Sequence, residues 1–393
     1  MKMKKTIAML LAATMGTSLL FGCGSPGVKS SAAPTAASTA PSAAVPKTIK
    51  IGLVAPLTGN SGIMGESQQH GYELAMSEIN AAGGVNGAQI ELVTYDDQAD
   101  PQKSASGAQK FADDDSILAI GGSCNSSATL AMTPITDAAG LPELVVSSSS
   151  PKLTGCSDYF FRMSVQDAAV GPQMAKALLN LGAKNVVVFY PNDDYGTGLS
   201  ASFKEYLEAN GGKVIDLLTY QATDQDFTAQ ITSAKNANPD AIALCGTPAD
   251  SGLIIKQLKQ NGVTVPTIGG TGLYNAKTLE IAGSAAEDVY VIGVYVASNP
   301  DPRVQELVNK FKAKYGSVPD GFAALAYDQM YVIAEAAKAA LADGELTRES
   351  LKDALKKTSY EGVTGTVSFN GDNDWVRDYL TLQVKNGDFV VAQ

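Results

Sequence analysis

Short apolar runs alternate with longer helical segments along most of the chain. From Thr48 onward, runs rich in Val, Ile and Leu predict nine strands, and the segments between them carry apolar residues at helical spacing. The predicted strands are IKIGLV (49–54), QIELVTY (89–95), ILAIGG (117–122), LPELVV (141–146), NVVVFY (185–190), KVIDLLTY (213–220), DAIALC (240–245), VPTIGG (265–270) and DVYVIGV (288–294). Strands that alternate with helices form parallel sheets with helices on both faces, so we expect an α/β fold with doubly wound parallel sheets.

Capping and turn residues mark where several helices begin and end. Residues 64–84 have apolar side chains at helical spacing, and a Gly-Gly pair closes that segment. Asp100 is placed to cap a helix that has Pro101 at its first position. Two Asn-Gly pairs, at 370–371 and 386–387, predict tight turns between β-rich runs. Longer helices are predicted at 301–315, 322–343 and 347–357.

Small polar residues follow the carboxyl ends of five predicted strands. Four serines, Ser147 to Ser150, follow LPELVV, and the segment SCNSSAT (123–129) leads from ILAIGG into a helix. Similar loops are PNDDYGTG (191–198), GTP (246–248) and TGLY (271–274). Helix capping alone would explain any one of these loops. Because ligands bind at the carboxyl ends of strands in open parallel sheets, the five loops together predict a shared ligand crevice.

The first residues have the layout of a secretory signal. Three lysines precede an apolar run within residues 1–22, which is typical of a cleaved signal peptide rather than a membrane anchor. The segment LFGC (20–23) resembles the lipobox of bacterial lipoproteins, so we expect a lipid on the sulfur of Cys23; an ordinary signal peptide with an unmodified cysteine is the alternative. Residues 23–47 are rich in Ala, Ser, Thr and Pro and predict a flexible tether. The remaining body would be held by its lipid at the outer face of a cell membrane, at the cell surface or in the periplasm.

Size and charge narrow the possible partners. The chain has 393 residues, 45% of them hydrophobic, which favours two domains over one. Its formal net charge is −11, and so acidic a surface argues against nucleic acid or an anionic bilayer as a partner. Small ligands stay possible, because their sites are set by local residues.

The residue inventory excludes most enzyme chemistries. His70 is the one histidine and lies in a predicted helix, and neither a zinc motif nor a glycine-rich phosphate loop occurs, so we expect no metal and no cofactor. Ser149 and Lys152 fit the S-x-x-K pattern of penicillin-binding proteins, but the SDN and KTG elements that accompany it are missing. The acidic residues within 96–100 suit turn and capping duties better than a cation site.

Three cysteines follow the predicted lipid attachment site. Export makes a disulfide chemically permissible among Cys124, Cys156 and Cys245. Cys245 ends an apolar strand, where a buried free thiol is usual. Cys124 and Cys156 both lie in loops just after predicted strands or turns, so we predict a bond between them; three reduced thiols are the alternative.

Seven segments in a fixed order carry a family resemblance. They are IGLVAPLTG (51–59), GYELAMSEINAAGGVNG (71–87), ELVTYDDQADP (91–101), GGSCNSSAT (121–129), PKLTGCSDYFFR (151–162), YGTGL (195–199) and FAALAYDQ (322–329). With them the chain resembles the leucine/isoleucine/valine-type solute-binding proteins of ABC importers, a type I periplasmic binding protein family. The resemblance implies two α/β lobes that are joined by a three-strand hinge and close about a ligand. Lobe one would comprise 48–165 and 296–378, and lobe two would comprise 166–295 and 379–393.

The resemblance also implies a set of ligand contacts. Asn125 and Ser149 would hold the α-carboxylate of the ligand through side chain and N–H, and Ser126 belongs with this group. Ser147 would offer its carbonyl to the ligand ammonium, and Tyr195 would supply an aromatic contact from lobe two. The residues expected to line the side-chain pocket are Met64, Thr247 and Phe322.

Two positions depart from the family pattern. The family commonly has an acidic residue, which neutralises the ligand ammonium, where this chain has Thr271. Thr271 stays among the expected ligand contacts, but a closed and dry site tolerates an unpaired ammonium poorly. The usual first cysteine of the family disulfide corresponds to Ala99, so Cys124 would need Cys156 as its alternative partner.

The sequence therefore predicts a binding protein and not an enzyme. It would capture a branched-chain or other hydrophobic amino acid and deliver it to ABC permease subunits, as a monomer. A small aromatic acid, an amide or a urea-like solute is an alternative ligand. Alternative roles are a ligand sensor for a signalling partner and a serine-lysine hydrolase, of which the second has the weaker support.

Overall fold

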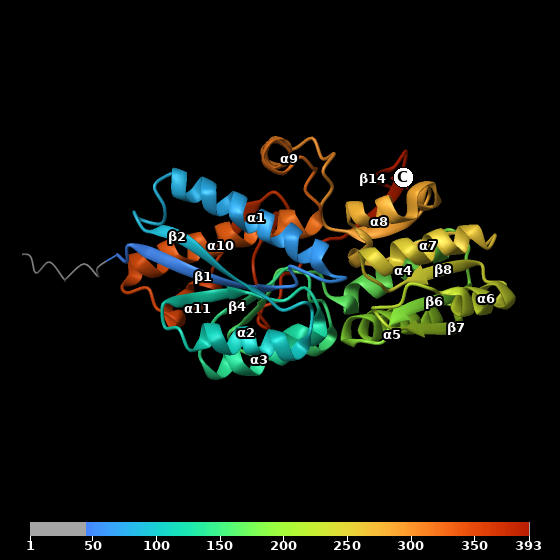
Figure 1. Cartoon of the computed structure of the whole chain (residues 1–393), viewed down its shortest axis with the longest axis horizontal. Helices are drawn as coiled ribbons and strands as arrows, with labels where there is room; N and C mark the ends of the chain where they lie inside the picture. The colour runs from blue at the N-terminus through green and yellow to red at the C-terminus, as the bar shows by residue number, and fades with distance from the viewer. Residues whose placement is uncertain (1–44, 393) are drawn as a thin grey trace, which may run out of the picture. The chain divides into compact units, whose positions relative to one another are not determined.

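The computed structural model of the chain describes residues 45–392 (Figure 1). The predicted signal peptide, the lipidated Cys23 and residues 23–44 of the predicted tether lie outside the described residues. Within residues 45–392, no helix combines the length and apolar character needed to cross a bilayer. The strands of this part form two larger sheets and one short hairpin.

The first sheet has five parallel strands in the order β2-β1-β3-β4-β5. Its strands are β1 (Thr48–Ala55), β2 (Gln89–Asp96), β3 (Ile117–Gly121), β4 (Glu143–Val145) and β5 (Phe160–Arg162). The helices that belong with it are α1 (Gly62–Ala81), α2 (Pro101–Ala112), α3 (Ser126–Ala138), α9 (Pro302–Tyr315), α10 (Gly321–Asp343) and α11 (Arg348–Leu355).

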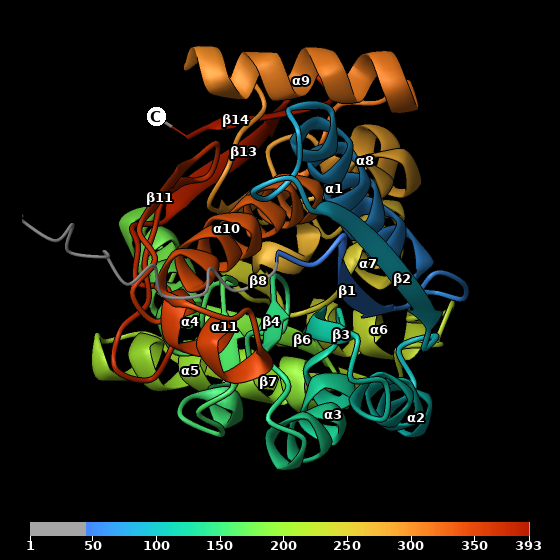
Figure 2. The same ribbon diagram turned by 90° about the vertical axis from the view of Figure 1, so that its left-hand side faces the viewer.

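Helices lie on both sides of the sheet at strand β1 (Figure 2), and most residues of this strand are buried. Successive side chains of a strand point to opposite faces. Leu53 belongs to the core cluster that contains Tyr72 of α1 and residues of α10. The next residue, Val54, packs in a separate cluster with Phe111 of α2 and Met132 of α3. The uninterrupted apolar run of β1 is thus explained by helices on both sides.

The second sheet has seven strands in the order β14-β13-β10-β9-β8-β6-β7. Its strands are β6 (Asn185–Pro191), β7 (Lys213–Tyr220), β8 (Ala241–Leu244), β9 (Thr267–Gly269), β10 (Tyr290–Gly293), β13 (Leu380–Lys385) and β14 (Asp388–Val391). Its helices are α4 (Asp167–Asn180), α5 (Asp194–Ala209), α6 (Thr228–Ala237), α7 (Pro248–Gln260) and α8 (Ala276–Ala282). Strands β6 to β10 are parallel, whereas β13 and β14 pair antiparallel at one edge. The sheet is mixed because the chain ends in a hairpin.

The chain passes between the two sheets three times, at 163–166, 294–301 and 368–379. The hairpin β11 (Tyr360–Gly362) and β12 (Gly365–Val367) precedes the third passage. Arg162 ends β5 directly before the first passage, Asp374 lies in the third, and the two residues form an isolated bridge. Two of the three passages are therefore joined to each other through their backbones.

The predicted α/β fold with two parallel-stranded layers is confirmed, and all nine predicted strands are present within two residues of their expected bounds. Asp100 caps α2 as predicted, because its side chain accepts from the N–H groups of Gln102 (2.9 Å) and Lys103 (3.0 Å). The turn at 386–387 is also confirmed, with positive φ at Asn386 (55°) and Gly387 (79°). The sequence prediction missed β5, because its three residues are not part of a longer predicted run, whereas the equally short β4 and β9 lie within the predicted runs 141–146 and 265–270.

The predicted bond between Cys124 and Cys156 is wrong, since the structure has both as free thiols. Cys124 is buried between Met64 of α1 and Phe322 of α10. Cys156 is exposed and follows the short 3-10 helix η1 (Pro151–Leu153). The two loops follow different strands and place their sulfurs in different surroundings.

Candidate ligand-binding site

A cavity lies where the carboxyl ends of strands from both sheets face each other. It encloses about 410 Å³ of space outside the protein atoms, a figure that includes space open to solvent. Its lining residues are Ser61, Met64, Cys124, Asn125, Ser126, Ser147, Tyr195, Thr247, Thr271, Gly272 and Phe322. The loops after β3 and β4 supply one wall, and those after β6, β8 and β9 supply the other. The structure thereby brings together eight of the nine residues that the sequence suggested as ligand contacts.

Ser149, the ninth predicted contact, lies behind this lining. Its side chain is fully buried, and its N–H donates to the hydroxyl of Ser126 (3.3 Å), as does the N–H of Ser150 (3.2 Å). Ser126 therefore stands between Ser149 and the cavity in this closed arrangement.

Asn125 begins helix α3 at the cavity. Its side-chain oxygen accepts from the N–H of Ser127 (2.9 Å), and its amide donates to Asp193 across the cleft (3.3 Å). Both ends of the side chain are thus engaged, which differs from the expectation that it holds a ligand carboxylate. What the helix start offers to an anion is its free backbone N–H groups and the positive end of its dipole.

The four consecutive serines, which we call the serine loop (Ser147–Ser150), have separate roles. Ser147 faces the cavity, and its hydroxyl accepts from Gln68 (2.8 Å). The Ser148 hydroxyl donates to the carbonyl of Ser123 (2.8 Å), while its own carbonyl accepts from Ser164 (2.7 Å). Ser150 caps η1. Polar residues at this strand end are therefore used partly for the site and partly to fix the loop.

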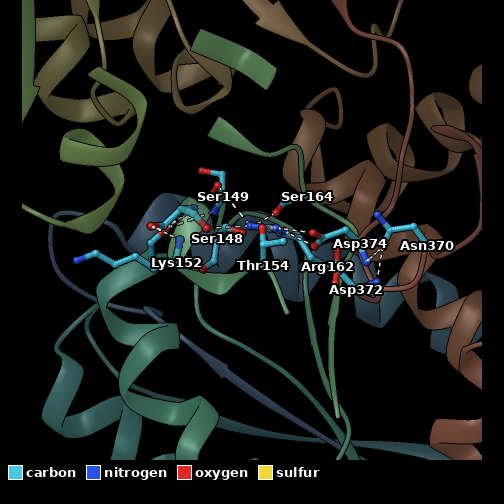
Figure 3. A network of polar contacts seen from close by, with 11 residues as sticks. Ser148, Ser149, Lys152, Thr154, Arg162, Ser164, Asn370, Asp372 and Asp374 are labelled. Atoms are coloured by element: carbon cyan, nitrogen blue, oxygen red, sulfur yellow. Dashed lines mark hydrogen bonds and ion pairs between the residues drawn. The ribbon is translucent and has the colours of Figure 1, made fainter. Parts of the chain in front are cut away.

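Arg162 fixes the serine loop from behind (Figure 3). Its guanidinium donates to the carbonyls of Ser149 (3.4 Å) and Ser150 (2.9 Å). It also forms a bidentate ion pair with Asp374, in which Nε donates to Oδ1 (2.6 Å) and Nη2 donates to Oδ2 (2.7 Å). Both side chains are fully buried, so this pair is strongly directional. The loop that borders the cavity is thus tied to the third passage between the sheets.

A second, more apolar hollow continues the cavity. It shares Ser147, Thr271 and Phe322 with the first cavity and encloses about 350 Å³ of space outside the protein atoms, which includes space open to solvent. Its other lining residues are Val146, Ser164, Val165, Tyr274, Gly293, Val294, Gly321 and Leu325. A bound molecule can therefore have a polar end near α3 and an apolar end near Val294 and Leu325.

Direct contacts hold the two halves together beside the cavity. Asp194 at the start of α5 pairs with Lys152 (2.5 Å) and accepts from the Ser127 hydroxyl (2.7 Å). On another flank, Asn275 donates to Asp320, the cap of α10. Burial raises the pKa of Asp320 to about 6. These contacts describe a closed form of the cleft.

The described lining residues include no carboxylate and no basic side chain. The polar groups at the cavity are hydroxyls, an amide and backbone groups. Thr271 thus lines the cavity at the position where the family resemblance implies an acidic residue, and no other carboxylate is in the described lining.

The other candidate chemistries of the sequence find little support in this arrangement. Lys152 pairs with Asp194 and is largely exposed, so its amine is directed to the cleft mouth, whereas Ser149 is buried. His70 lies in α1 and stacks on Tyr315 with ring centroids 3.9 Å apart. Over residues 45–392, no group of three or more metal-binding side chains gathers, and buried Asp97 accepts from Ser104 and Ser123.

Residues 48–388 match the periplasmic binding protein family. The chain belongs to this family. Periplasmic binding proteins of known function resemble it over most of their length. The Leucine-, isoleucine-, valine-, threonine-, and alanine-binding protein of Pseudomonas aeruginosa is 32% identical over 348 residues, which are 88% of this chain and 90% of that protein.

Solved structures show the same likeness. The branched-chain amino acid transporter substrate binding protein LivJ of Streptococcus pneumoniae, in complex with isoleucine, is 32% identical with a TM-score of 0.81, covering 87% of this chain and 98% of that one. A solute binding protein of an ABC transporter from Rhodopseudomonas palustris, in complex with 3,4-dihydroxy benzoic acid, is 26% identical with a TM-score of 0.81, covering 88% and 95%. The type I periplasmic binding protein fold is thereby confirmed.

Three cavity residues of this periplasmic binding protein were not among the predicted contacts. Gly272 lies in the loop 271–274, which the sequence analysis had already singled out, and Ser61 lies after strand β1, where the same rule would have found it. Cys124 was predicted to form a disulfide and was therefore not considered as a lining residue. Burial raises the pKa of its thiol, so this sulfur acts as an apolar wall atom.

Proposed function

We propose that this protein captures a branched-chain or other hydrophobic amino acid outside the cytoplasm and delivers it to the permease of an ABC importer. The observation that carries the proposal is the cavity between the two sheets, which has polar groups at one end and an apolar hollow at the other. An α-amino acid with an aliphatic side chain has the same division between a polar head and an apolar tail. The amino acid-binding relatives support this choice.

Closure of the cleft supports the role of carrier. The contacts of Asp194 with Lys152 and Ser127 join the two halves at the cleft mouth and enclose whatever lies in the cavity. A ligand that bridges both walls favours the closed form by its differential affinity for that form. A permease could then distinguish the loaded protein from the empty one by shape.

Binding screens test the proposal directly. Thermal unfolding measured with leucine, isoleucine, valine, benzoate, isocaproate and urea should show the largest rise in melting temperature for the aliphatic amino acids. A ligand at a hundredfold excess over its dissociation constant stabilises the folded state by about 2.7 kcal/mol, which such a screen detects easily. A response to benzoate or urea and none to amino acids would contradict the proposed ligand class.

An aromatic acid is the second candidate ligand, because no carboxylate lines the cavity. An ammonium group there lacks a direct counter-charge. An aromatic acid has no ammonium, and its carboxylate would meet the same hydroxyls and helix N–H groups as the carboxylate of an amino acid. The Rhodopseudomonas palustris structure with a dihydroxybenzoic acid supports this candidate. The same screen decides between the two ligand classes.

Membrane attachment through Cys23 is part of the proposal and is supported by the sequence alone. Metabolic labelling with a radioactive fatty acid should mark the wild-type protein and not a Cys23→Ala variant. Label on both would refute this attachment site.

A binding role also predicts that the protein has no hydrolase activity. A covalent serine-directed probe should leave Ser149 unlabelled, since this hydroxyl is fully buried and Lys152 is engaged by Asp194. Labelling of Ser149 would support the hydrolase alternative.

The sensor alternative predicts instead that the closed protein binds a signalling partner and not permease subunits.

A further inference from the structure

Three residues beside the cavity have buried polar atoms without partners. Among the described residues, eight buried side-chain oxygen and nitrogen atoms lack a hydrogen bond. Four of these eight belong to Ser149, Asp167 and Tyr195. Buried polar groups are normally paired, because an unpaired one loses its hydration without compensation. The Ser149 hydroxyl lies near the Asp167 carboxyl, and the Tyr195 hydroxyl lies near the N–H of Gly272. These atoms are therefore compensated only in part, and the Asp167 carboxyl keeps unused acceptor capacity.

The three residues are neighbours. The N–H of Asp167, the first residue of α4, donates to the carbonyl of Ser149 (2.9 Å), which places the two side chains next to each other. Tyr195 lines the cavity, and the charge of Asp167 contributes to the raised pKa of its hydroxyl, after burial. Helix α5 closes over them, since a Cβ on Gly198 would lie 3.5 Å from Asp167 Oδ2.

Asp167 has no cation of its own. The titratable groups around it are Arg162 of β5, Asp193 and Tyr195 at the start of α5, Cys245 after β8 and Tyr379 before β13. Arg162 is the one cation among them, and Asp374 already engages it through two hydrogen bonds. Burial raises the pKa of Asp167 to about 8, and the Ser149 hydroxyl and Arg162 oppose that rise.

A hydroxyl group has one proton to donate and two lone pairs to accept with. If the Ser149 proton is directed to Asp167, the lone pairs of Ser149 Oγ remain for a donor on the ligand. A ligand ammonium is such a donor, and it also carries the positive charge that the group lacks.

We propose that Asp167 is a positioning residue for a ligand ammonium, orienting Ser149 Oγ as its acceptor and supplying, one layer behind the cavity wall, the negative charge that Thr271 does not. This inference rests on the proposed capture of an amino acid. It explains how a cavity without a lining carboxylate can still prefer an amino acid to the acid that lacks its ammonium. It requires the Ser126 hydroxyl, which accepts from the Ser149 N–H in this closed form, to move aside so that Ser149 Oγ contacts the bound ligand.

Leucine and isocaproate, its analogue without the amino group, test the proposal as a pair. Isothermal titration calorimetry on the wild-type protein should give tighter binding for leucine. Asp167→Asn should raise the dissociation constant of leucine at least tenfold, in line with a lost charge-assisted hydrogen bond. It should leave the dissociation constant of isocaproate within about twofold of the wild-type value. Equal losses for both ligands, or no loss for either, would overturn the proposal.

Glu143→Gln is the matched control. Glu143 is also fully buried with an unpaired oxygen, and burial raises its pKa to about 8, but it lies on β4 outside the cavity lining. This variant should keep the wild-type preference for leucine. If Asp167→Asn does not fold, Ser149→Ala measured in the same way should lose the same preference, and a retained preference would overturn the proposal.

Proton release on ligand binding is a second measurement, and it would not change with the ligand if Asp167 had only a structural role. An ammonium near Asp167 favours the ionised carboxylate, so leucine binding at pH 7 should expel a proton while isocaproate binding should not. Titrations in buffers of different ionisation enthalpy measure this difference, and identical proton exchange for both ligands would overturn the proposal. Wild-type protein that binds neither ligand would refute the proposed function and the inference with it, whereas a preference for isocaproate would refute the inference alone.

Discussion

At the scale of single residues, the main feature of the cavity is that Thr271 carries no negative charge where the family commonly has an acidic residue. A threonine hydroxyl can accept from an ammonium but cannot neutralise it. We expect Thr271→Glu to increase the ratio of leucine affinity to isocaproate affinity by about tenfold or more, because it places a carboxylate in the lining itself. Calorimetric titration of both ligands measures the ratio. Thr271→Gln has the same size without the charge and should leave the ratio near its wild-type value; an unchanged ratio in the Glu variant would contradict this account.

Glu143 allows a test of burial without a ligand. Its side chain accepts from Thr136 (2.6 Å), and burial raises its pKa to about 8. The folded state then binds more protons than the unfolded state between the unfolded pKa and about pH 8, so this residue lowers the free energy of unfolding as pH rises. Glu143→Gln should therefore gain more than about 1 kcal/mol relative to wild type between pH 5 and pH 8. Urea denaturation at both pH values measures this gain, and a pH-independent difference would show that Glu143 stays hydrated.

At the scale of elements, the serine loop depends on a buried ion pair from another part of the chain. Asp374→Asn would leave the buried Arg162 guanidinium without its counter-charge, with its carbonyl acceptors in the serine loop unchanged. We expect a loss of about 3–5 kcal/mol in the free energy of unfolding. Denaturant titration measures the loss. Lys385→Gln removes an exposed pair with Asp288 and should cost less than about 1 kcal/mol. A similar small cost for both variants would mean that the buried pair is not a structural anchor.

The elements also show how far the sequence could be interpreted. Apolar runs located all the parallel strands of five or more residues, whereas the six-residue β13 was expected only as a β-rich run beside the turn at 386–387. β5 was missed because Phe160 to Arg162 are not part of a longer predicted run, unlike the equally short β4 and β9. Strand-end loops gave the cavity, since topology alone brings such loops together. The position of Ser149 behind Ser126 and the engagement of Asn125 by Asp193 depend on side-chain contacts between distant segments, which no local pattern encodes.

At the scale of the whole described body, closure depends on contacts between the two halves. Lys152 is 69% exposed on its side chain, so its pair with Asp194 is weak and sensitive to salt. We expect Lys152→Ala to weaken leucine binding about two- to fivefold, through faster dissociation, because the closed form loses one tie. Stopped-flow dissociation at low and high salt measures the effect. Lys204→Ala removes a pair with Glu208 inside α5 and should not change the rate; equal effects would exclude a role in closure.

The three passages of the chain between the sheets have a consequence for synthesis. Strands of the second sheet come from residues 185–293 and again from 380–391, so neither half can be expressed as one uninterrupted fragment. During translation the first sheet has all its strands once Arg162 has left the ribosome, whereas the second waits for the final hairpin. Its edge strand β10 stays uncovered until the last residues emerge, which makes that nascent edge the most exposed to chaperones and to aggregation.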